Sequence, residues 1–257
     1  MKTHNTAFEY KFNLVYDSPM NNTNDPYLKI STTGSSTIAQ FMTRVYSWMS
    51  IGIFLTAAVS YFISSDEALV TSIMTNPVLF YGCIIAQVAV VLSMSFLIQR
   101  INAVTATLLY LAYAALTGVT FSILFLIYTK DSMASIFALT AFSFSGLTAV
   151  GFFTKRDLGP VGSFCTMGLF GMIGWGLLSL FFPSMMSGTY STVYSIVGVI
   201  VFAGLTAYDT QKIKQIGAAS TYGSDSNKKA AIFGALTLYL DFINLFISLL
   251  RLMGKRR

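Results

Sequence analysis

The chain contains 257 residues, of which 54% are hydrophobic and 10% are charged, and its formal net charge is +6. Soluble domains carry about 25% charged residues, so this chain has too few charges to cover a soluble exterior. Its mean hydropathy of +0.67 excludes disorder as well. Composition therefore predicts an integral membrane protein, in which an excess of basic residues indicates the positive-inside rule rather than nucleic-acid binding.

The histidine and cysteine content excludes several kinds of catalytic and metal site. The single histidine, His4, lies in the polar N-terminal segment, so no histidine is available inside the membrane for a metal centre or a catalytic dyad. Cys83 and Cys165 lie in separate apolar stretches, and we expect both to be packing residues rather than disulfide partners. We therefore expect no resident cofactor.

Residues 1–43 are polar, rich in Asn, Ser and Thr, and are predicted to form a flexible tail. We expect no cleaved signal peptide, because the segment lacks a basic region followed by a short apolar core. Residues 38–44 are expected to form a short interfacial helix that leads into the first span.

Residues 44–257 are predicted to form one seven-helix transmembrane domain. Each apolar segment is long enough to span a bilayer. Short breaks containing Pro, Asn, Gly or charged residues separate them, so neighbouring helices are expected to be antiparallel. The segments are 45–63, 77–98, 103–128, 132–153, 160–182, 191–213 and 229–252. The fold class is therefore an all-α integral membrane bundle.

The distribution of Lys and Arg predicts the orientation. With a cytoplasmic N-terminus, the outer loops between spans contain only Lys130. The C-terminal cluster at 255–257 departs from this pattern. Either it lies outside after a full seventh span, or the last segment re-enters the membrane and returns. The inner side would contain Arg44, Arg100, Lys155, Arg156, Lys212, Lys214, Lys228 and Lys229.

Two acidic residues, Asp209 and Asp241, lie within apolar segments, whereas the others lie in the tail or loops. A charge at the bilayer centre costs about 2.5–3.5 kcal/mol on insertion scales, so such residues usually face a bundle interior and are functional. The alternatives are a side chain that snorkels from a helix end and a buried ion pair used only for packing.

Helical spacing places both aspartates on polar faces. Small and polar residues of the last segment recur every three or four positions within a stripe about 100° wide. A similar face exists in the sixth segment, and the two aspartates lie at similar predicted depth. We therefore expect the faces to meet. The two faces consist of Gly234, Thr237, Asp241, Asn244, Ser248 and Arg251, and of Ser195, Gly198, Thr206 and Asp209.

Two adjacent carboxylates in a low dielectric cannot both ionise cheaply, so Asp209 and Asp241 are expected to share one proton. Such a pair can sense pH, relay protons or transiently bind a hard cation such as Ca²⁺. A bound cation would compete with protons, so acidity would weaken its binding. Arg100 or Arg44 is a candidate latch for a deprotonated aspartate, and the candidate pore-lining residues are Thr206, Thr237 and Asn244.

Two segments around these aspartates, residues 204–212 and 234–246, resemble the signatures of the Bax inhibitor family, also called the transmembrane Bax inhibitor motif family. Residues 115–118 and 154–158 supply further matches. The resemblance extends over residues 40–257 and is strongest to the bacterial branch.

The resemblance implies a central last helix surrounded by the other six, in a bacterial inner membrane. It also implies a pH-sensitive Ca²⁺ leak gated by an aspartate pair at the positions of Asp209 and Asp241. The family's gating arginine corresponds approximately to Arg100. An acidic residue in the second helix of some relatives appears here as Gln87, so a proposed outer-path carboxylate is absent.

The leading hypothesis is therefore a non-enzymatic, proton-modulated Ca²⁺ leak that interacts with the lipid bilayer, Ca²⁺ and protons. The alternative is a non-transporting regulator that binds a membrane protease or another membrane protein. An intramembrane aspartyl protease fits less well, because Asp241 is preceded by Leu238-Tyr239-Leu240 instead of the Gly-x-Gly sequence of those enzymes.

Overall fold

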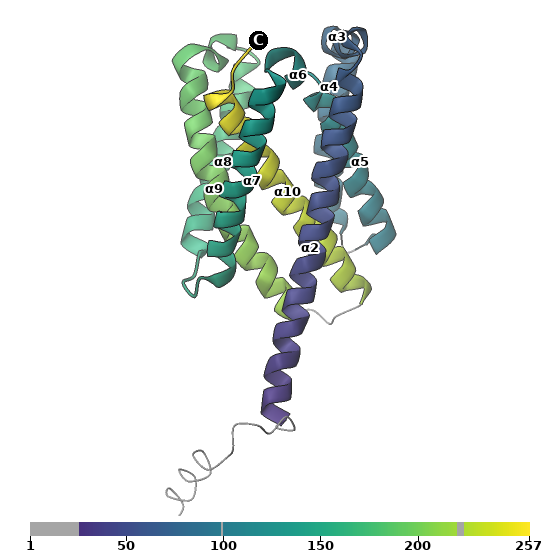
Figure 1. The fold of residues 1–257 in the computed structure, drawn as a ribbon, viewed down its shortest axis with the longest axis vertical. Helices are drawn as coiled ribbons and strands as arrows, with labels where there is room; N and C mark the ends of the chain where they lie inside the picture. The colour runs from purple at the N-terminus through teal and green to yellow at the C-terminus, as the bar shows by residue number, and fades with distance from the viewer. Residues whose placement is uncertain (1–25, 99, 220–223) are drawn as a thin grey trace, which may run out of the picture.

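The computed structural model describes residues 26–98, 100–219 and 224–257, with side chains from residue 37 onward except at residue 186 (Figure 1). These residues form helices and no β-strand; an isolated antiparallel bridge joins Tyr128 to Arg256. The helices are α2 (Pro26–Ser64), α3 (Glu67–Thr75), α4 (Pro77–Leu97), α5 (Ala103–Phe121), α6 (Leu124–Ile127), α7 (Lys130–Phe153), α8 (Gly159–Ser179), the 3₁₀ helix η1 (Pro183–Met186), α9 (Gly188–Ala219) and α10 (Asp225–Met253).

The predicted all-α, seven-span bundle is confirmed. Seven helical stretches of the described chain are long and apolar enough to cross a membrane, and each corresponds to one predicted segment. They are Thr37–Ser64, Pro77–Leu97, Ala103–Ile127, Lys130–Phe153, Gly159–Ser179, Gly188–Ala219 and Asp225–Met253.

The polar breaks between segments act as helix caps. The Asp66 side chain accepts hydrogen bonds from two backbone N–H groups in the first turn of α3, a short helix absent from the predicted elements. Asn76 caps α4 in the same way, with a proline in its first turn, and Asn102 caps α5. Side-chain oxygens thus satisfy N–H groups that have no partner within the helix.

Helix α2 begins earlier than the sequence indicated, so the predicted boundary between residues 43 and 44 falls inside a continuous helix. Phe41 is fully buried, and its ring lies so close to Gly217 of α9 that a Cβ there would overlap it. This packing explains helical structure in a segment whose composition alone favours a tail. Residues 1–25 of the predicted tail lie outside the described residues.

Helix α10 is the centre of the bundle. Two thirds (67%) of its most apolar window is buried, compared with 6–39% for the other six spans. It packs against α9, α2, α7 and α5. Figure 1 shows it passing diagonally between α7, α8 and α9 on one side and α2, α4 and α5 on the other. Tyr239 of α10 is fully buried, and its hydroxyl lies 2.6 Å from that of Thr56 in α2.

The two ends of the bundle differ in their connections. The proximal end holds the last turns of α4, α7 and α9 and the first turns of α5, α8 and α10, and the distal end holds α3, α6, η1 and the C-terminal residues (Figure 1). The basic residues predicted for the inner side belong to the proximal end. Lys130 and the cluster at 255–257 belong to the distal end.

The two placements left open for the C-terminal cluster are now resolved. Helix α10 is a full span without a re-entrant turn, and the residues after it bind the α6–α7 connection at the distal end. The Thr129 backbone N–H donates to the Lys255 carbonyl at 3.1 Å, and the Arg257 N–H donates to the Ile127 carbonyl at 3.0 Å. The C-terminal cluster therefore lies at the end opposite to most of the other basic residues.

Candidate functional site

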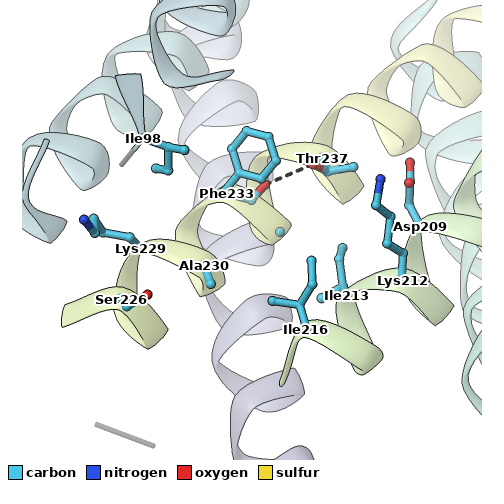
Figure 2. A pocket seen from close by; sticks show the side chains of 11 residues that line it. Ile98, Asp209, Lys212, Ile213, Ile216, Ser226, Lys229, Ala230, Phe233 and Thr237 are labelled. Atoms are coloured by element: carbon cyan, nitrogen blue, oxygen red, sulfur yellow. Dashed lines mark hydrogen bonds between the residues drawn. The ribbon is translucent and has the colours of Figure 1, made fainter. Parts of the chain in front are cut away.

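The predicted polar stripe of α10 lines two cavities. The proximal cavity has a volume of about 590 Å³ and is lined from α10 partly by Gly234 and Thr237 (Figure 2). The middle cavity has a volume of about 460 Å³ and is lined partly by Asn244, Ser248 and Arg251. The stripe therefore faces open space on both sides of the position of Asp241.

The packing of α9 against α10 brings Asp209 and Asp241 together. Their carboxyl groups lie within hydrogen-bonding reach of each other, and a hydrogen bond between them requires a proton on one of the two, because an ionised carboxylate can only accept. Asp209 lines the proximal cavity, and Asp241 is 4% exposed. The pair thus lies along α10 between the proximal and middle cavities.

One oxygen of Asp241, Oδ2, is buried and has no hydrogen-bond partner among the described residues. A buried acceptor without a partner costs about 1–3 kcal/mol, so few remain in folded proteins and each has a specific reason. Here the oxygen is available to accept a hydrogen bond or to coordinate a cation. The nearby Cys165 interacts electrostatically with this aspartate and is a buried free thiol, as expected for a packing residue.

Two lysines of the proximal cavity were missed by sequence reasoning. Lys212 lies one helical turn after Asp209 and interacts electrostatically with it; Figure 2 shows the two side chains next to each other. Lys229 also lines the cavity, and its Nζ forms a salt bridge with Asp225 at 3.7 Å. The (i, i+3) spacing of Asp209 and Lys212 was the available signal.

The three candidate pore-lining residues have different surroundings. Thr237 lines the proximal cavity, with its hydroxyl donating to the Phe233 carbonyl at 3.1 Å. Asn244 lines the middle cavity, with its amide donating to the Leu240 carbonyl at 2.8 Å. Thr206 is fully buried between helices, and its hydroxyl donates to the carbonyl one turn earlier in α9. The structure therefore brings two of the three to a cavity.

The two candidate latch arginines lie at the proximal end. Arg100 is exposed in the turn between α4 and α5, and the neighbouring Ile98, rather than Arg100, lines the proximal cavity. The Arg44 guanidinium donates to the Asn227 side-chain oxygen at 3.3 Å, which links α2 to the first turn of α10. The structure thus brings neither arginine to the aspartate pair in this conformation.

Comparison with known proteins gives the family. The model of a family described as "Inhibitor of apoptosis-promoting Bax1" matches residues 38–257, a range that contains nearly the whole of the seven spans. The chain belongs to the Bax inhibitor family. The resemblance stated from the sequence is therefore confirmed.

Several bacterial proteins align with this Bax inhibitor family member along most of its chain. "Inner membrane protein YbhL" of Escherichia coli strain K12 is 44% identical over 221 residues, which cover 84% of this chain and 92% of that protein. An uncharacterized protein of Borreliella burgdorferi is 40% identical over 218 residues, covering 85% and 93%. Another from Rickettsia prowazekii is 37% identical over 246 residues, covering 90% and 98%. With seven apolar helices, this chain is an integral membrane protein.

Gln87 lies in the second span of this Bax inhibitor family member. Its amide nitrogen donates to the Leu116 carbonyl and to the Thr120 hydroxyl, each at 3.4 Å. Gln87 lines the middle cavity and therefore presents a neutral amide there instead of a carboxylate.

The aspartate pair alone does not make a complete set of ligands for a metal ion. Among the described residues, no group of three or more His, Cys, Asp or Glu side chains gathers at one point. Ca²⁺ takes six to eight oxygen ligands, and two carboxyl groups supply only part of that number. In this Bax inhibitor family protein, water and backbone oxygens would have to supply the rest.

Proposed function

We propose that this protein is a passive, non-enzymatic cation path whose transported ion is Ca²⁺ and whose gate is the Asp209–Asp241 pair. The observation that carries the proposal is the pairing of the two carboxyl groups, located between two cavities on one polar stripe. In this proposal, the aspartate pair alone holds the shared proton and attracts the Ca²⁺ ion.

In the closed state, the shared proton holds α9 and α10 together at the gate. The hydroxyl of one carboxyl group donates to the carboxylate of the other, and the pair carries one negative charge. Such a charge-assisted hydrogen bond is short and strong in a low dielectric. The gate therefore presents a joined pair rather than two free ligands.

Loss of the shared proton changes both the charge and the geometry. Two adjacent carboxylates repel each other strongly where water is scarce, which separates the side chains. The separated pair carries two negative charges and attracts a divalent cation. Because protons and Ca²⁺ compete for the same oxygens, flux should fall as pH falls.

The membrane orientation is part of the proposal. We place the proximal end, with its basic residues, in the cytoplasm and the distal end outside, in a bacterial inner membrane. A C-terminal alkaline phosphatase fusion expressed in Escherichia coli should then be active, and a fusion after residue 156 should be inactive. The reverse pattern would overturn this orientation.

The decisive experiment measures Ca²⁺ entry into proteoliposomes that contain a Ca²⁺ dye, at several pH values. Wild-type protein should give a flux that falls with acidity. Asp209→Asn and Asp241→Asn should each remove most of this pH dependence, because an amide cannot share the proton. Asp131→Asn, an exposed carboxylate at the distal end, is the matched control and should behave as wild type.

Two results would overturn the proposal. The path lies elsewhere if both Asn variants retain the wild-type flux and its pH dependence. If wild-type protein gives no flux at any pH, the regulator hypothesis gains support. In that case, crosslinked membrane partners should be retained by both Asn variants.

A further inference from the structure

The distal end contains a third cavity, of about 650 Å³, called here the distal cavity. Arg251, in the last turn of α10, and Arg256, in the C-terminal segment, both line it. The backbone of Arg256 is fixed by the bridge to Tyr128 and by the adjoining hydrogen bonds to the α6–α7 connection. Two arginines from separate segments thus line one cavity, and the Arg251 guanidinium lies 5.8 Å from the centre of the Tyr194 ring.

The lining of the distal cavity contains no carboxylate. The salt bridge recorded between two described residues, Lys229 with Asp225, lies at the other end of the molecule. A guanidinium group is always charged, and it binds phosphate oxygens through paired N–H donors. The hydroxyl group of Ser191 in the same lining is a further donor. This set of groups favours an anion.

The distal and middle cavities adjoin each other, because Ile84, Gln87, Ile247 and Arg251 line both. Away from the arginines, the middle cavity is lined mostly by apolar side chains. From α4 and α8 these are Ile84, Val88, Val91, Leu92, Leu169, Met172 and Ile173. The combined space thus has a cationic end and an apolar continuation.

The apolar continuation opens sideways toward the bilayer. Helix α4 is the least buried span, at 6% of its most apolar window, and packs chiefly against α5. Val88, Leu92 and Ile173 line the middle cavity and are each about half exposed, at 53%, 49% and 49%. From Ile84 to Leu92 the groove follows α4 for about 12 Å at 1.5 Å per residue. An extended hydrocarbon chain fits such a groove.

We propose that the distal and middle cavities together bind one anionic phospholipid. Its phosphate lies between Arg251 and Arg256, and one acyl chain lies along α4 and α8. The last turn of a membrane-spanning helix lies near the level of lipid headgroups, so the cationic end is at the right depth. Free inorganic phosphate shares the headgroup chemistry but cannot use the apolar groove.

Native mass spectrometry of the full-length, delipidated protein in detergent tests this proposal. The protein is titrated with phosphatidylglycerol and, separately, with phosphatidylcholine of identical acyl chains. We expect one phosphatidylglycerol to bind at least tenfold more tightly than phosphatidylcholine. A millimolar excess of inorganic phosphate should not displace it. Equal binding of the two lipids, or complete displacement by phosphate, would overturn the proposal.

Variants locate the site. Arg251→Gln and Arg256→Gln should each weaken phosphatidylglycerol binding about tenfold, as expected for the loss of charge-assisted hydrogen bonds. Lys255→Gln removes a neighbouring positive charge that does not line the cavity, and it should bind as wild type. Unchanged binding by the double arginine variant, or an equal loss with Lys255→Gln, would contradict the assignment. The lipid comparison on wild-type protein stands if a variant does not fold.

The proposed lipid site and the proposed cation path share the middle cavity, so the two proposals are separated by their measurements. Ca²⁺ flux is measured in liposomes of fixed composition, whereas lipid binding is measured on the isolated protein. Failure of one measurement therefore leaves the other intact.

Discussion

The proximal and distal ends of α10 differ in charge although one polar stripe runs through both. Around Asp209 and Asp241, two carboxyl groups meet, with Lys212 nearby. Ten residues beyond Asp241, about 15 Å along the helix, Arg251 faces cavities without a carboxylate. The stripe is therefore divided electrostatically, with carboxyl groups at the level of the proposed cation site and a guanidinium group at the level of the proposed lipid site.

The largest expected effects come from variants that remove the charged groups of one region and leave the other region unchanged. The double variant Asp209→Asn/Asp241→Asn should lower Ca²⁺ flux at least tenfold, because the gate loses its negative charge. Arg251→Gln/Arg256→Gln should leave flux within about threefold of wild type and should weaken phosphatidylglycerol binding instead. Both variants are measured in the flux and the lipid-binding assays. A shared loss in both assays would show that the two ends form a single site.

A smaller effect is expected from overpacking the helix contact on which both regions depend. A Cβ added at Gly198 of α9 would overlap the Ser248 side chain of α10. Gly198→Val should therefore cost about 1–3 kcal/mol of stability, the usual range for overpacking. Thermal unfolding in detergent measures the loss, and Gly171→Val, on a face with no atom near the added Cβ, is the matched control. Equal melting temperatures would contradict the close contact.

The opposite face of α10 should affect stability without affecting either assay. Tyr239→Phe removes the hydroxyl that pairs with Thr56, which retains its hydrogen bond to the Ala114 carbonyl at 2.8 Å. We expect a loss of about 0.5–1.5 kcal/mol, the net value of one hydrogen bond. Thermal unfolding measures this loss. A change in the pH dependence of Ca²⁺ flux would show that Tyr239 takes part in gating.

The smallest effect is expected from Lys212→Gln. The positive charge of Lys212 favours the ionised form of the aspartate pair, so its removal should retain the shared proton to a higher pH. Half-maximal Ca²⁺ flux should then move to higher pH by about 0.3–1 unit, since an exposed lysine is partly screened. Lys214→Gln, whose Nζ donates to the Phe152 carbonyl instead, is the control. A shift to lower pH would contradict this role.

Much of the fold followed from local sequence signals. The seven spans follow from apolar length, and Asp66, Asn76 and Asn102 are the caps that polar breaks predict. The meeting of the two aspartates followed from helical spacing and the scarcity of intramembrane charge. The central position of α10 came from the family resemblance, because periodicity does not specify which helix others surround.

The remaining features depend on contacts between distant segments. The extension of α2 depends on Phe41 meeting Gly217, 176 positions later in the chain. The distal cavity depends on residues 254–257 binding the α6–α7 connection. Thr206 shared a predicted face with Asp209, but its hydroxyl donates a hydrogen bond within its own helix. The spacing of residues along the sequence does not indicate which acceptor a hydroxyl will use.

The central position of α10 has a consequence for biogenesis. Synthesis proceeds from the N-terminus, so α10 is the last of the seven spans to leave the ribosome. Until it inserts, the six earlier spans lack the helix that covers their inner faces, and Thr56 and Asp209 lack their partners on it. The central helix is therefore the last to be added to the bundle. We expect a chain that is arrested before residue 225 to be degraded by membrane quality control.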